Sequence, residues 1–203
     1  MHLLAFAVAA GFVAGAILPS AVSAADTYQI DPAHTSVQFS VRHMLISNVR
    51  GEFRKVAGSA TGDIANPAAT TVEATIDAAS IDTRNEERDA HLRKPDFLDV
   101  AKFPTIVFKS TKVEKAGEGW KLTGDLTLHG VTKPVVLDVT NVTAPIKDPW
   151  GNSRIGAQAK TKLNRRDFGI AYNALLEGGG LVVGDEITVA IDVEVVKKGA
   201  TAQ

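Results

Sequence analysis

The sequence predicts an all-β domain in which antiparallel strands form either a sandwich or a closed up-and-down barrel. Two observations lead to this fold class. Apolar and polar residues alternate with a period of two along most of the chain, which is typical of strands that bury one face. The alternating runs are short, and turn signals such as those at 117–119, 130–134 and 148–152 separate them. Because the chain has no internal repeat and no long low-complexity linker, we expect one domain.

Nine runs of residues fit a strand. The last run is the clearest, with Ile187, Val189 and Ile191 on one face and Thr188 and Ala190 on the other. The predicted strands cover residues 37–42, 49–53, 60–64, 71–77, 105–113, 120–129, 135–142, 154–163 and 186–195. Their shared alternation indicates that the apolar faces point into a common core or cavity.

One stretch does not follow the period of two. Thr83 and Glu86 have the spacing of a capping box, in which the first residue caps a helix and the fourth reaches back to it. We therefore expect a helix over 84–93, ended by Pro95, because the residue before a proline avoids helical geometry. With a further short turn of helix, this makes a helical insertion at 84–99.

The first 25 residues are typical of an export signal. Residues 3–18 are almost wholly apolar, which is short of the roughly 20 residues that a membrane span needs, and small residues follow as far as Ala25. We expect a signal peptide over 1–25, cleaved after Ala24 or Ala25, and a mature domain over 26–203 in a bacterial periplasm or outside the cell. An uncleaved membrane anchor is the alternative.

Composition argues against several classes of function. The 22 Lys+Arg against 23 Asp+Glu give a formal net charge of -1, without the basic field that an electrostatic nucleic-acid binder needs. The chain has no cysteine, and therefore no disulfide, iron–sulfur cluster or thiol chemistry. Its 2 Trp and 2 Tyr are too few for the two aromatic girdles of a transmembrane barrel.

Several motifs resemble the YceI-like family, in the same order along the chain and from about Thr27 to Val196. They are DPAHTSVQFSVRHM at 31–44, RDAHLR at 88–93 followed by DF at 96–97, FPTIVF at 103–108, GDLTLHGVTKP at 124–134, RRDFGI at 165–170 and VGDE at 183–186. The resemblance implies a lipocalin-like antiparallel eight-stranded β-barrel in the periplasm. It also implies an interior that binds polyisoprenoid or related lipids, and a family that is not generally enzymatic.

An eight-stranded barrel is large enough to hold one small ligand. The inward candidates are mostly aliphatic and leave room for a thin, flexible chain, although they can also interdigitate to fill the core. We expect an isoprenoid lipid, either a polyprenyl phosphate or a quinone, whose tail contacts Phe39, Val41, Phe53, Phe108, Leu126, Phe168 and Ile170. A tail of about 20 carbons would contribute on the order of 6 kcal/mol, at roughly 0.3 kcal/mol per heavy atom.

Basic residues are the candidates for binding a polar head group. Arg84, Arg88 and His91 have the i, i+4, i+7 spacing of one helical stripe, and guanidinium groups suit phosphate oxygens. The alternative is a solvated face whose charges are balanced by neighbouring acidic residues. Other basic candidates lie at predicted strand ends, where they can face a ligand or pair with nearby carboxylates: Arg42, His43 and Arg165.

Other functions remain open at this point. No two histidines have the spacing of a metal site, so we expect no metal and no cofactor beyond a bound lipid or quinone. A hydrolase or isomerase would use His and Asp at the barrel mouth, with His34 and His91 as candidates. A stress-protective structural protein would have a barrel filled by its own side chains. An exposed edge strand would allow a homodimer.

Overall fold

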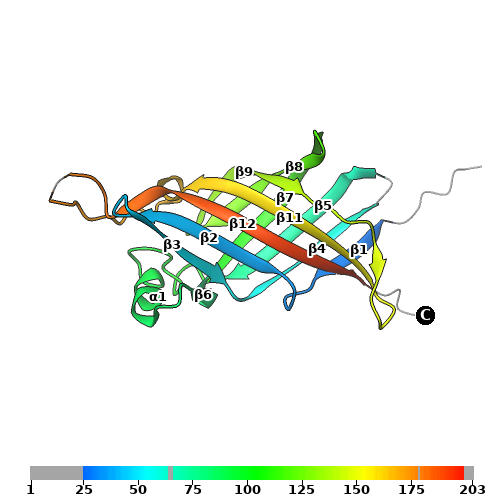
Figure 1. The fold of residues 1–203 in the computed structure, drawn as a ribbon, viewed down its shortest axis with the longest axis horizontal. Coiled ribbons are helices and arrows are strands. Elements are labelled where there is room, and N and C mark those ends of the chain that lie inside the picture. Colours follow the sequence, from blue (N-terminus) through cyan, green and yellow to red (C-terminus); the bar gives the residue numbers. More distant parts are fainter. Residues whose placement is uncertain (1–24, 64–65, 178, 199–203) are drawn as a thin grey trace, which may run out of the picture.

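The computed structural model describes residues 25–63, 66–177 and 179–198, so that residues 1–24 of the predicted signal peptide lie outside them (Figure 1). The strands are β1 (Asp26–Ile30), β2 (Ser36–His43), β3 (Ser47–Phe53), β4 (Val56–Asp63), β5 (Asn66–Asp77), β6 (Ile81–Asp82), β7 (Thr105–Ala116), β8 (Gly119–Leu128), β9 (Val131–Thr140), β10 (Ile146–Lys147), β11 (Ser153–Asn164) and β12 (Val183–Lys197). The helices are η1 (Ala78–Ser80), α1 (Glu86–Leu92) and η2 (Arg165–Phe168). None of these helices is long and apolar enough to cross a membrane.

Eight of the strands form a closed antiparallel ring. The order around it is β11, β9, β8, β7, β5, β4, β1 and β12, and β12 pairs back with β11. The predicted eight-stranded barrel is therefore confirmed, and the alternative of a sandwich is wrong. Closure removes the exposed edges that an open sheet would present along these strands.

The last strand, β12, closes the ring over its whole length. One edge of β12 pairs with β11 through residues 186–196. The other edge pairs first with β2 and then, through Val195, Val196 and Lys197, with β1. The strands β1 and β2 thus lie end to end along β12 as one interrupted strand. The strands β3 and β4 continue this arrangement by pairing with β2 and β1 respectively.

The helix α1 and its flanking turns cover one end of the barrel (Figure 1). A buried cluster lies beneath them, with Phe39, Phe53, Leu92, Val100 and Leu128 packed around it. The members of the cluster are Ile81, Phe97, Leu98 and Ile170. We call this the covered end of the barrel.

The helix begins later than the capping box predicted. Its N-cap is Asn85, whose side chain accepts a hydrogen bond from the Arg88 amide. Thr83 does not cap the helix, because its amide and hydroxyl both donate to the buried carboxylate of Asp89. Arg84 lies outside the helix with a φ of 61°. The prediction of a helix over 84–93 is wrong by two residues at its start, since a tertiary contact determines which residue is the cap.

The seam between β9 and β11 is short for the length of these strands. Of ten residues in β9 and twelve in β11, only 138–140 and 158–160 pair with each other. Toward the covered end the two strands diverge, and the Thr161 hydroxyl donates to the carbonyl oxygen of Val136 at 2.8 Å. A side chain therefore bridges the strands just beyond the end of the backbone ladder.

Candidate ligand-binding cavity

The barrel encloses a cavity of about 510 Å³. This volume lies within the range of small-molecule sites, roughly 300–1,000 Å³. All eight strands of the ring contribute to its lining, and the side chains are almost all aliphatic or aromatic. The interior is therefore not filled by the protein's own side chains, in contrast to the alternative of an interdigitated core.

Small residues on the inner face keep the middle of the barrel open. In β11 the alternation points Ile155, Ala157, Ala159, Thr161 and Leu163 inward, so that only the ends of the strand carry large apolar groups. Inward alanines also line the cavity from β4 and β5, at Ala60 and Ala74. Because these methyl groups are short, the space across the barrel axis stays open.

The cavity reaches solvent at the end opposite the covered end. Val142 lines the cavity and is 50% exposed. The chain that follows carries two more large apolar groups in solvent, Ile146 and Trp150, the latter 80% exposed. A molecule in the cavity can therefore contact solvent near the segment that joins β9 to β11.

Six of the seven residues predicted to contact a tail line this cavity. They are Phe39, Val41, Phe53, Phe108, Leu126 and Ile170. The seventh, Phe168, lies in η2 and is 2% exposed, but it lines a groove on the outside of the barrel. Gly169 follows it with a left-handed φ of 77°, and the chain then places Ile170 in the cavity wall instead.

Arg165 is the only predicted head-group residue that lines the cavity, and its guanidinium is already bound. Its Nε donates to the carbonyl of Gly184 at 2.9 Å, its Nη1 to that of Ile170 at 2.8 Å, and its Nη2 to the Asp185 carboxylate at 2.9 Å. The residue is 4% exposed, and this burial lowers the pKa of Arg165 while Asp185 opposes the shift. Arg165 thus links η2 to the start of β12 through hydrogen bonds.

The other predicted head-group residues lie outside the cavity, around α1 and the β2–β3 turn. Arg88 donates from Nε and Nη2 to the hydroxyl and carbonyl of Thr83. Arg42 donates to the Leu45 carbonyl.

The imidazole of His91 lies 3.2 Å from Asp96 and packs edge-on against Phe97 and Tyr172. His43 pairs with Ser47 across the β2–β3 hairpin. The predicted stripe of Arg84, Arg88 and His91 does not form, because Arg84 is not helical.

Few polar groups line the cavity. Apart from Arg165, the polar side chains among the described lining residues are hydroxyls and one amide: Tyr28, Thr35, Gln38, Ser59, Thr70, Thr143 and Thr161. No histidine or carboxylate is among them. Sequence reasoning did not single out these hydroxyl groups, although strand alternation placed Thr161 on the same face as Leu163. This lining can hold an apolar molecule and offers it weak hydrogen bonds.

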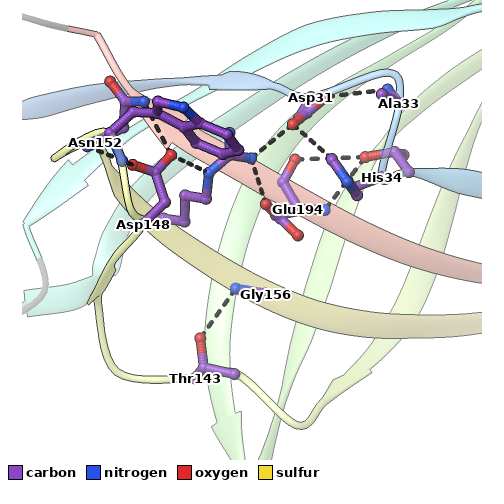
Figure 2. Close-up of polar contacts among 11 residues, drawn as sticks. Asp31, Ala33, His34, Thr143, Asp148, Asn152, Gly156 and Glu194 are labelled. Atoms are coloured by element: carbon purple, nitrogen blue, oxygen red, sulfur yellow. Dashed lines mark hydrogen bonds and ion pairs between the residues drawn. The ribbon is translucent and has the colours of Figure 1, made fainter.

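An ion-pair network on the outer face of the barrel ties three distant segments together. Arg154 donates to Asp148 at 2.7 Å, to Asp31 at 2.6 Å and to Glu194. Figure 2 shows these three carboxylates from the β10–β11 turn, the β1–β2 turn and β12. His34 adds a contact of 2.9 Å to Asp31.

The network shifts the titration of its members. The hydrogen bonds from Arg154 and then His34 lower the pKa of Asp31 to about 2. Burial would raise the pKa of Asp148, but hydrogen bonds from Arg154, Asn152 and backbone amides hold it well below its usual range. Asp31, His34 and Glu194 lie close enough together to hold a metal ion, yet Arg154 already supplies their positive charge.

Fold and cavity together define a class of protein: a lipocalin-like closed barrel with an apolar interior of ligand size. The chain belongs to the YceI-like domain family, whose model matches residues 28–195. A UPF0312 protein of Vibrio cholerae is 44% identical over 165 residues, which cover 80% of this chain and 86% of that protein. The resemblance seen in the motifs is confirmed.

Two solved structures have the same fold. BcnA of Burkholderia cenocepacia matches with a TM-score of 0.71 at 22% identity, over 81% of this chain and 98% of that one. A polyisoprenoid binding domain from Saccharophagus degradans, implicated in plant cell wall breakdown, matches with a TM-score of 0.59 at 16% identity. That match covers 84% of this chain and 98% of the Saccharophagus chain.

Proposed function

We propose that the protein binds the chain of an isoprenoid lipid inside the barrel and carries or sequesters it. The observation that carries this proposal is the cavity of about 510 Å³, lined almost wholly by apolar side chains. The polyisoprenoid binding domain of Saccharophagus degradans, which shares the fold, supports the same class of ligand. Each methylene that enters such a cavity gains about 0.8 kcal/mol by leaving water.

The lining predicts that the chain, more than the head group, sets the affinity. Among the described residues of the wall, the one charged side chain is that of Arg165, and its donors are engaged by the protein. At roughly 0.3 kcal/mol per heavy atom, about 20 buried carbons give on the order of 6 kcal/mol, or a Kd of tens of micromolar. A polyprenyl phosphate and an isoprenoid quinone both supply such a chain.

We place this activity in the periplasm or outside the cell. The apolar run at residues 3–18 and the small residues up to Ala25 support export by a cleaved signal peptide. The intact mass of the protein recovered from the periplasm of an expressing bacterium tests this. We expect the mass of a chain whose first residue is Ala25 or Asp26. Full-length protein retained in the membrane fraction would refute export.

Native mass spectrometry of the purified protein, followed by organic extraction, tests the ligand. We expect a bound species that leaves on extraction, has the mass of an isoprenoid lipid and can be restored by adding a prenyl lipid. Protein that is repeatedly recovered empty, and that also fails to bind added prenyl lipids, would overturn the proposal.

A further inference from the structure

A groove of about 300 Å³ lies on the outside of the barrel, over the divergent part of the β9–β11 seam. Its sides are residues 133–136 of β9 and 161–164 of β11, and Asp167 and Phe168 of η2 lie at its end. Three of these residues, Val135, Thr161 and Leu163, also line the internal cavity. The groove and the interior of the barrel therefore meet at these three side chains.

Lys133 stands out among the residues of this groove. It pairs with Leu126 of β8, which lines the cavity, and directly paired residues share one face of a sheet. Lys133 therefore lies on the inner face of β9, in line with Val135 and Leu137. It is nevertheless exposed, because β11 diverges from β9 at this level and leaves that face open.

The charge of Lys133 is not balanced by a near neighbour. Within the described part of the chain, no carboxylate lies within ion-pair distance of its ammonium group, whereas Lys162 across the groove pairs with Glu186 at 2.8 Å. Asp167 also lines the groove, without an ion pair to either lysine. Lysines are almost never fully buried unless they are paired, so the divergence of β11 is what allows Lys133 to lie on this face without a neighbouring carboxylate.

We propose that the groove holds the polar end of the ligand, with an anionic head group on Lys133 and the apolar chain passing between Val135, Thr161 and Leu163 into the cavity. This inference rests on the proposed function and adds a head-group chemistry, a phosphate or a carboxylate. It also places the head group on Lys133 and not on the arginines considered from the sequence, of which Arg42, Arg88 and Arg165 donate to other groups of the protein.

Two probes with the same chain test the proposal: farnesol and farnesyl monophosphate. The wild-type protein is expected to bind the phosphate about tenfold more tightly than the alcohol at low salt, the size of one charge-assisted hydrogen bond. The preference shrinks at high salt because the ammonium is exposed. Lys133→Met keeps the apolar stem and is expected to bind both probes equally, with an unchanged affinity for farnesol.

Two further variants control for charge and folding. Lys133→Arg retains the charge and is expected to keep the preference for the phosphate. Lys109→Met removes an exposed lysine from the outer face of β7, where it pairs with Glu73, and is expected to behave as the wild type. All three variants should show an unchanged thermal midpoint, since the substituted side chains are exposed.

Three other outcomes would each contradict the proposal in a different way. A phosphate preference that survives in Lys133→Met, or that is missing from the wild type, overturns the assignment of Lys133 while leaving the apolar cavity in place. Displacement of farnesyl monophosphate by an equal concentration of inorganic phosphate would mean a chain-independent anion site, which also overturns the proposal. Failure of the wild type to bind either probe overturns the proposed function together with this inference.

Discussion

Filling the cavity tests whether its empty space is used for binding. Ala157 lies on the inner face of β11, opposite Val193 of β12, and lines the cavity with only a methyl group. In Ala157→Phe the added ring would displace about six carbons of a bound chain. At roughly 0.3 kcal/mol per heavy atom the loss is about 2 kcal/mol, which is about a 30-fold increase in Kd for farnesol. Fluorescence displacement of a polarity-sensitive probe measures this change.

The stability of the same variant distinguishes an open cavity from a filled core. A ring that enters open apolar space should leave the free energy of unfolding unchanged or raise it, whereas overpacking a filled core costs about 1–3 kcal/mol. Ala57→Phe makes the same chemical change at an exposed position of β4 and should alter neither Kd nor stability by much. An Ala157→Phe protein that binds farnesol as well as the wild type, or that unfolds more easily, would refute the reasoning.

Three further perturbations address the scaffold. Because the pKa of Asp31 is lowered to about 2, its ionised form stabilises the fold above pH 4, and this stabilisation should be lost as the pH falls from 4 to 2. Arg154→Met should weaken this pH dependence of the free energy of unfolding, which urea unfolding at each pH measures. If the network contributed nothing to stability, the variant and the wild type would show the same dependence. Arg165→Met should cost about 3 kcal/mol, since it leaves buried acceptors unpaired; a thermal midpoint equal to the wild type would contradict this. Gly124→Ala should lower the free energy of unfolding by about 2 kcal/mol, because its Cβ would lie 2.4 Å from the ring of Phe108 and 2.5 Å from a backbone oxygen. An unchanged free energy in chemical unfolding would mean that Phe108 and the neighbouring strand can shift to make room.

Strand alternation was sufficient to predict most of the barrel. In β8 it places Leu122, Leu126 and Leu128 on one face, and the structure has all three in the cavity wall. It did not find β1, whose residues alternate too briefly to be recognised. That segment is a strand because β4 and β12 pair with its two edges, and both partners are distant in the sequence.

The lining of the cavity was easier to predict than the surroundings of the basic side chains. Side-chain direction in a strand depends on parity alone, so Phe39 and Phe108 could be placed from the sequence. Arg88 and Arg165 could not. The donors of Arg88 are used by Thr83 in the turn before α1, and those of Arg165 partly by Gly184 and Asp185, which only the fold brings near. Lys133 was overlooked, although it shares the parity of Val135; the missing information was the divergence of β11.

The pairing of β12 with both β11 and β1 makes the barrel dependent on its final segment. Gln29 lies beside Val196 in the finished ring, so the first and last strands meet only after every other strand has been made. A chain still being synthesised has unpaired edges on both sides of this gap, and it must collapse as a whole once β12 is available. Truncation of the chain within the last residues of β12, ahead of Lys197, should therefore open the ring and expose these edges to aggregation. An affinity tag is better placed after Lys197 than within the strand.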